Sequence, residues 1–135
     1  MTVYLNRTRK FYINGVSIHM ELFRPVGEKE YILIKESGFK KFPPRLPEQP
    51  IFYPVLTENY AVEIASKWNT KDSFSGNKGY VLRFVVSDEY ISKFDIQTVG
   101  NEYHKEFWIP SEQLEEFNKN IIGDIELIHM FEKIK

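Results

Sequence analysis

Residues 97–110 read QTVGNEYHKEFWIP, and this stretch organises the expected fold. Extended chain flanks a Gly-Asn pair that is typical of a tight turn. We expect strands over residues 95–99 and 103–109. Because alternate side chains of a strand point to opposite faces, His104, Glu106 and Trp108 share one face of the second strand. If this face lines a cleft, it offers a general base, a neighbouring carboxylate and a stacking surface; if it faces water, the row has no special role.

Length and composition predict one globular domain over residues 1–135. The chain is 42% hydrophobic and 27% charged, which is typical of a soluble protein. Its net charge of −1 gives no general attraction to nucleic acid or anionic lipid. Arg7, Arg9 and Lys10 form either a local basic patch or a solvated terminal segment.

The residue types that are absent exclude several chemistries. The chain has no cysteine, which excludes disulfides, thiolate nucleophiles and cysteine-ligated zinc. No apolar run approaches the roughly 18 residues that cross a bilayer. The N-terminus lacks the apolar segment of a signal peptide, so we expect a cytoplasmic protein without membrane contact.

The first half of the chain predicts a hairpin, a helix and a proline-rich segment. Residues 10–26 alternate around Asn14-Gly15, a type I′ turn pair, and Arg24-Pro25 is expected to end the second strand. A helix over 27–37 follows. Residues 39–50 then carry Pro44, Pro47 and Pro50 at the period of a polyproline II helix, either as a ligand for a proline-binding module or as a stiff connector.

The second half predicts one capped helix and several short elements. Thr57 is expected to cap a helix over residues 58–68, whose apolar stripe we expect to be buried. The strands and helices expected along the chain do not alternate regularly, as they would around a parallel sheet. The expected fold class is therefore α+β, with one or two small, mostly antiparallel sheets and three or four short helices. The stripe consists of Tyr60, Ala61, Ile64, Ala65 and Trp68. The later elements are a short strand at 51–53, a polar loop at 69–79, a strand at 80–86, a short helix at 88–94, a helix at 111–120 and a strand at 125–131.

Few catalytic motifs are present. His19, His104 and His129 are the only histidines and show no metal-ligand spacing, so no metal site is predicted. Glycine-rich phosphate loops and a nucleophile elbow are also missing. The pair His104-x-Glu106 is the best signal, because a desolvated carboxylate stabilises positive charge or orients a hydroxyl nucleophile.

Several segments together resemble a known family. The match covers about residues 20–131 and resembles small bacterial proteins labelled "ADP-ribosylation/crystallin-type". The order of elements is also similar to the ADP-ribosyltransferase-like fold, in which two small sheets at an angle hold NAD in the cleft between them. The matching segments are FRPVG at 23–27, the run from 42 to 69, GYVLRF at 79–84, QTVG at 97–100 and EFWIPSEQLEEFN at 106–118.

This resemblance implies roles for individual residues. Arg24 matches the arginine that contacts the dinucleotide in arginine-directed transferases. Glu106 matches the glutamate that stabilises the oxocarbenium-like ribose, and His104 stands where those enzymes have Gln or Glu. The Ser-Thr-Ser motif of those enzymes is missing, and the residues 51–53 occupy its region.

We therefore expect a nucleotide-binding protein, with NAD as the candidate substrate and ADP-ribose transfer to an unidentified protein or nucleic-acid acceptor as the candidate reaction. The alternative is a non-catalytic binding module on the same fold. Whether Arg24 and Glu106 share a cleft distinguishes the two. The candidate site residues are Glu106 and His104 for catalysis, and Arg24, Tyr53, Trp68 and Asn69 for nucleotide binding.

Overall fold

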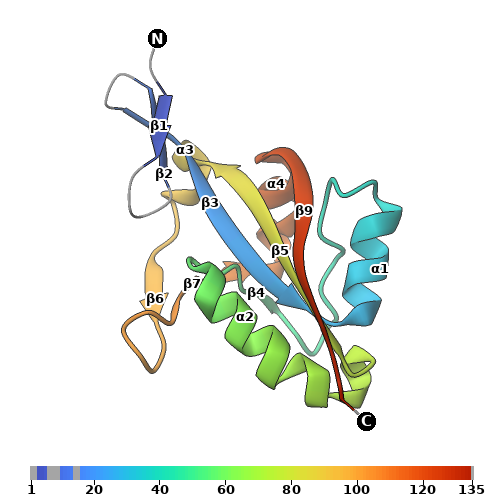
Figure 1. The fold of residues 1–135 in the computed structure, drawn as a ribbon. Helices are drawn as coiled ribbons and strands as arrows, with labels where there is room; N and C mark the ends of the chain where they lie inside the picture. The colour runs from blue at the N-terminus through green and yellow to red at the C-terminus, as the bar shows by residue number, and fades with distance from the viewer. Residues whose placement is uncertain (1–2, 6–9, 14–15, 135) are drawn as a thin grey trace.

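A five-stranded antiparallel sheet forms the centre of the computed structural model, which describes residues 3–5, 10–13 and 16–134 (Figure 1). The predicted hairpin is confirmed, since its two strands pair antiparallel with Ile13 opposite Val16. The Asn14-Gly15 turn and the basic residues Arg7 and Arg9 lie outside the described residues. The strands, in spatial order, are β1 (Val3–Leu5), β2 (Lys10–Ile13), β3 (Val16–Val26), β5 (Lys78–Ser87) and β9 (Ile121–Glu132).

Pro25 does not end β3, contrary to the prediction. The strand continues to Val26, and Pro25 lies opposite Val81 of β5. The N–H of Phe23 donates to Val55 on the side of β3 away from β5. Because N–H groups of residues i and i+2 point the same way along a strand, the nitrogen of Pro25 also points away from β5, so no ladder hydrogen bond is lost.

Within the described residues, four α-helices cover the two faces of this sheet. On one face, α2 packs on Phe23 and Val81. The other face carries the larger core, which includes Ile34 of α1, Tyr90 of α3 and Phe117 of α4. The predicted class, α+β with small antiparallel sheets and a few short helices, is confirmed. The helices are α1 (Glu28–Glu36), α2 (Glu58–Lys67), α3 (Asp88–Ile91) and α4 (Leu114–Lys119).

Two short strand pairs lie beside β3. Residues 103–109 were predicted as one strand, but they are divided between β7 and β8, which have different partners. The turn before β7 is confirmed, with Gly100 at φ 74° and the amide of His104 donating to the carbonyl of Asn101. The pairs are β4 (Ile51–Phe52) with β8 (Ile109–Pro110), and β6 (Ile96–Thr98) with β7 (Lys105–Phe107).

Val55 connects these pairs to the main sheet. Its backbone forms one bridge with Phe23 of β3 and another with Glu106 of β7. The Phe23 bridge has both hydrogen bonds, at 2.9 and 2.8 Å. The backbone at Val55 therefore lies between Phe23 and Glu106. The Glu106 side chain is on the face that α2 covers, where Tyr60 donates to it.

Two further elements differ from the sequence prediction. The final strand begins at Ile121 rather than at residue 125, with Gly123 at φ 74° inside an irregular part of the β5–β9 pairing. The polar loop 69–79 contains two 3₁₀ turns, Asn69–Lys71 and Ser73–Ser75. Asp72 caps the second turn, where its carboxylate accepts a hydrogen bond from the amide of Phe74.

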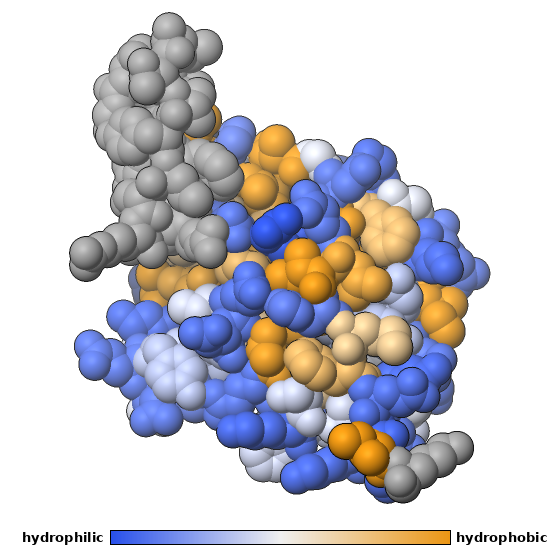
Figure 2. All heavy atoms as spheres, in the orientation of Figure 1, coloured by the Kyte–Doolittle hydropathy of each residue, from blue (hydrophilic) through white to orange (hydrophobic). Residues whose placement is uncertain are grey.

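The surface around β9 is mixed in polarity. Figure 2 shows hydrophilic residues over most of this face, with hydrophobic residues gathered near its middle, over the central strands. Ile122, Leu127 and Met130 of β9 are among the exposed large hydrophobic residues. Some exposed apolar surface is normal for a small protein.

Helix α2 begins as predicted but ends before Trp68. The hydroxyl of Thr57 accepts a hydrogen bond from the amide of Tyr60 at 3.2 Å, which confirms the cap. Tyr60, Ala61 and Ala65 are buried, whereas Trp68 is 68% exposed, so its predicted burial is wrong. Trp68 follows Tyr60 by eight residues, which at about 100° per residue places it roughly 80° around the helix axis from Tyr60. Because α2 ends at Lys67, the ring lies at the end of the helix and outside the core.

The stability of two aromatic variants tests this correction. We expect Trp68→Ala to change the free energy of unfolding by no more than about 0.5 kcal/mol, as for other exposed positions. Phe117→Ala, at a ring that is fully buried between Phe52 and Phe84, should cost about 3–5 kcal/mol. Urea titration of both variants measures the difference, and a large loss for Trp68→Ala would place the indole back in the core.

Candidate functional site

A cavity of about 430 Å³ lies where β3, β7 and α2 meet. It forms because Val55 holds β7 at the edge of β3 while α2 crosses the same corner. The cavity is lined by one acidic and one basic residue among apolar and aromatic residues. Its lining residues are Arg24, Pro25, Tyr53, Val55, Ile64, Val99, Glu106 and Trp108. Arg24 and Glu106, whose placement was to distinguish the two candidate functions, both line this cavity.

Glu106 is buried and firmly held. The residue is 8% exposed, and each carboxylate oxygen accepts one hydrogen bond. One comes from the Tyr60 hydroxyl at 2.9 Å and the other from the Trp108 indole Nε1 at 2.7 Å. Burial, followed by the hydrogen bond to Glu106, raises the pKa of Tyr60 well above its ordinary value, so the phenol stays protonated and donates. The carboxylate thus has a fixed orientation in a mostly apolar cavity.

His104 lies behind this carboxylate rather than in the cavity. Its ring stacks on Tyr60, with centroids 4.4 Å apart and an interplanar angle of 19°. Its Nε2 is 3.1 Å from a carboxylate oxygen of Glu63, a residue of α2. His104 therefore supports Tyr60, which in turn holds Glu106. The three residues predicted to share a face are connected. Trp108 donates to Glu106, and His104 stacks on Tyr60, which also donates to Glu106.

Glu63 is a site residue that the sequence analysis missed. It accepts a hydrogen bond from the Tyr103 hydroxyl at 2.6 Å in addition to its contact with His104. The Tyr103 hydrogen bond, and then that of His104, lower the pKa of Glu63. Its position three residues after Tyr60 on one helix face was the available signal. Only the tertiary contact with the β6–β7 turn gives that position a role.

The pH dependence of stability tests the role of Glu63. Because its pKa is lowered in the folded state, its contribution is present above the ordinary glutamate pKa of about 4.3 and is lost as the pH falls below that value. We expect Glu63→Gln to be less stable than wild type at pH 7, with the difference shrinking between about pH 5 and pH 3. Denaturant titrations at several pH values measure this, and Glu115→Gln, at an exposed glutamate of α4, is the matched control. A pH-independent difference would contradict the assignment.

Arg24 is held by a buried ion pair. Its Nε and Nη2 donate to the two carboxylate oxygens of Glu30 at 2.7 and 2.9 Å, and Nη1 donates to the carbonyl of Tyr53 at 3.3 Å. The guanidinium also lies over the Phe52 ring, 4.5 Å from its centroid. Arg45 approaches the same Glu30 carboxylate at 3.6 Å, and burial followed by the charge of Arg24 lowers the pKa of Arg45. Two cations thus share one carboxylate, which leaves a net positive charge at this edge of the cavity.

Two aromatic rings flank the cavity. Tyr53 is 40% exposed and Trp108 is 45% exposed. They meet edge to face, with ring centroids 6.5 Å apart and an interplanar angle of 85°. Rings of this exposure present accessible faces to a ligand, which is what stacking of a base or a pyridine ring requires.

Trp68 and Asn69 are not brought to Glu106. Trp68 is exposed at the end of α2 and does not line the cavity. Asn69 lines a neighbouring cavity of about 230 Å³, which shares Arg24 and Pro25 with the first one. There its Nδ2 donates to the Ser75 hydroxyl at 3.3 Å. Of the six predicted site residues, Glu106, Arg24 and Tyr53 therefore line one cavity, and His104 lies behind it against Tyr60.

Other kinds of site are not found in the part of the chain that the structure describes. Over residues 3–5, 10–13 and 16–134, no three His, Asp or Glu side chains come close enough to hold a metal ion. Among these same residues, no helix has the length and apolar character needed to span a bilayer.

Comparisons with known proteins do not test the family resemblance, which stays a prediction. No protein-family model matches this chain, and no curated protein and no solved structure matches it either.

Proposed function

We propose that the Glu106 cavity binds a nucleotide, with NAD as the candidate substrate, and that the protein transfers its ADP-ribose group to an acceptor. The observation that carries the proposal is that Arg24, Tyr53, Glu106 and Trp108, from three segments far apart in the sequence, line one cavity. A cation site, a carboxylate and two accessible rings are the groups that a phosphate, a ribose and a heterocycle need.

Glu106 supplies the chemical step in this proposal. When the bond between ribose and nicotinamide breaks, positive charge develops on the ribose. A fixed carboxylate in a mostly apolar cavity stabilises that charge more strongly than a solvated one. The hydrogen bonds from Tyr60 and Trp108 hold Glu106 in place before the substrate arrives, so no reorganisation is needed.

Binding is assigned to the two ends of the cavity. Tyr53 and Trp108 offer faces for the heterocycle. The excess positive charge of Arg24 and Arg45 over Glu30 favours phosphate at the other end, where the smaller cavity continues past Arg24. Phe52 takes the region of the missing Ser-Thr-Ser motif and supports the Arg24 guanidinium from below.

The second candidate is a non-catalytic binding module. One observation favours it: both oxygens of Glu106 already accept hydrogen bonds, and Arg24 already pairs with Glu30. A protein with such satisfied groups can bind a ligand through the aromatic rings without turning it over.

A thermal-shift screen over NAD, ADP-ribose, ATP and nicotinamide tests the proposal. A ligand at 100 times its Kd adds about 2.7 kcal/mol to the stability of the folded state, which is readily measured. Mass spectrometry of released nicotinamide then separates the two candidates. Binding with release supports the transferase, and binding without release supports the module. If no nucleotide binds, the transferase proposal fails, and the non-catalytic module, whose ligand need not be a nucleotide, is left standing.

A further inference from the structure

The outward face of α1 is apolar at its centre. The inner side of this helix is marked by Ile34, which is buried, and by Glu30, which pairs with Arg24. Ile32 and Leu33 lie toward the other side and are 46% and 51% exposed. At about 100° per residue, the midpoint between these two side chains is roughly 150° around the axis from Ile34. Figure 1 shows α1 at the edge of the molecule, so this apolar face points outward.

One charged residue stands at each end of this apolar centre. Lys29, Ile32, Leu33 and Glu36 follow the spacing i, i+3, i+4, i+7 and therefore form one stripe along α1. Both charged residues are exposed. Within the helix, the positions three and four residues from each charge are Ile32 and Leu33, so no opposite charge lies one turn away. Neither Lys29 nor Glu36 forms an ion pair with another residue of 3–5, 10–13 or 16–134.

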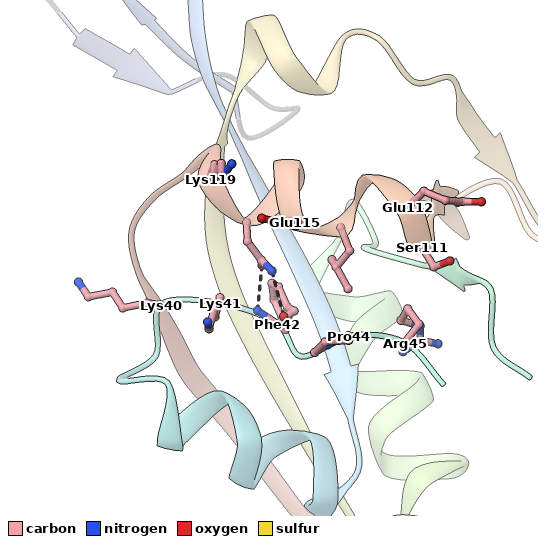
Figure 3. Close-up of a pocket in the computed structure, with 11 residues that line it drawn as sticks. Lys40, Lys41, Phe42, Pro44, Arg45, Ser111, Glu112, Glu115 and Lys119 are labelled. Atoms are coloured by element: carbon pink, nitrogen blue, oxygen red, sulfur yellow. Dashed lines mark hydrogen bonds between the residues drawn. The ribbon is translucent and has the colours of Figure 1, made fainter. Parts of the chain in front are cut away.

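Helix α1 is anchored near both ends. In its first turn, both carboxylate oxygens of Glu30 accept hydrogen bonds from Arg24. Beyond its last turn, the Phe42 amide donates to Asn118 and the Phe42 carbonyl accepts from it, both at 2.9 Å (Figure 3). A surface that is already ordered loses less conformational entropy when it binds. The stripe is therefore prepared for a partner.

We propose that α1 pairs in an antiparallel arrangement with α1 of a second copy of this chain. A two-fold axis between residues 32 and 33 places Ile32 against the partner's Leu33 and Lys29 against the partner's Glu36. Symmetry repeats each contact, so two apolar contacts and two ion pairs form. A basic end, an apolar centre and an acidic end make the stripe complementary to its own reversed copy, which is the requirement of a two-fold interface.

The ring of Phe74 extends this surface beside the helix. Phe74 is 58% exposed, and the Lys29 Nζ lies 4.5 Å from its ring centroid. Both residues also line the smaller cavity next to the Glu106 site, so the interface reaches the rim of that cavity. The stripe and this ring are far fewer than the roughly 20–30 residues per side of a standard interface, so we expect a weak dimer with a Kd on the order of 100 µM.

Sedimentation velocity at protein concentrations from about 10 µM to about 1 mM tests the pairing. We expect the sedimentation coefficient of the wild type to rise with concentration toward that of a dimer. Lys29→Glu alone and Glu36→Lys alone should each weaken association by about tenfold or more, because two attractions become two repulsions. An equimolar mixture of these two variants should associate at least as well as the wild type, since the acidic stripe of one then faces the basic stripe of the other.

Two uncharged variants test the apolar centre. Leu33→Gln should weaken the dimer by about fivefold or more, because symmetry removes the apolar contact twice. Ile96→Gln changes a similarly exposed residue of β6, on the opposite side of the molecule from α1 in Figure 1, and should leave association within about twofold. Circular dichroism checks that each variant folds. A wild type that stays monomeric at every concentration, a variant mixture that does not associate, or equal losses for Leu33→Gln and Ile96→Gln would overturn the proposal.

Discussion

Glu106→Gln is expected to reduce nicotinamide release from NAD by about 10²–10³-fold while the protein stays folded. The amide keeps the size of the carboxylate and an oxygen that accepts one of the two hydrogen bonds from Tyr60 and Trp108. It lacks the negative charge that stabilises a cationic ribose. The variant should therefore bind the nucleotide and fail in turnover, which calorimetry and mass spectrometry measure on the same sample.

Two controls make this result specific. Glu115→Gln removes an exposed carboxylate outside the cavity and should leave both measurements unchanged. Trp108→Phe keeps an aromatic ring at the cavity but removes the indole donor to Glu106, so we expect a smaller loss of turnover than for Glu106→Gln. If Glu106→Gln releases nicotinamide at the wild-type rate, Glu106 is not the catalytic carboxylate. If the wild type releases none, the binding module is the better description.

The second large effect concerns the buried ion pair of Arg24. Glu30→Ala should destabilise the protein by about 3–5 kcal/mol, because it leaves a buried guanidinium without its counter-charge. Arg45 raises this cost, since it also loses the Glu30 carboxylate and then faces Arg24 without compensation. Urea titration with a linear extrapolation measures the change.

A double-mutant cycle separates the pair from its surroundings. Arg24→Met keeps an unbranched chain over the Phe52 ring, and Glu30→Leu keeps an apolar side chain of similar length. We expect the double variant to be more stable than either single variant, because replacing both charges removes the desolvation cost along with the attraction. Additive losses would show that Arg24 and Glu30 do not interact in solution.

The same cycle tests the phosphate role of Arg24. If the guanidinium only holds β3 to α1, the double variant should keep its affinity for a nucleotide. If it contacts phosphate, affinity should fall even in the stable double variant. This comparison distinguishes a structural arginine from a binding one, which a simple Arg24→Ala variant cannot do because that change also unpairs Glu30.

The local elements could be predicted from the sequence because short-range interactions determine them. Thr57 caps its helix through the amide of a residue three positions away, and Gly100 permits the positive φ of a turn within its own hairpin. The α+β class followed from such signals. The alternation in residues 103–109 also placed His104, Glu106 and Trp108 on one face, since that pattern depends only on the geometry of an extended chain.

Long-range pairing decided the rest. Val55 bridges Phe23 and Glu106, and this contact brings β7 to β3 beside the cavity. Glu63 and Tyr60 acquire roles because the β6–β7 turn packs against α2, and Trp68 loses its predicted place because the helix ends one residue earlier. A local pattern sets which side of a strand or helix a residue occupies. The partner on that side comes from segments tens of residues away, and their pairing is determined by packing of the whole chain.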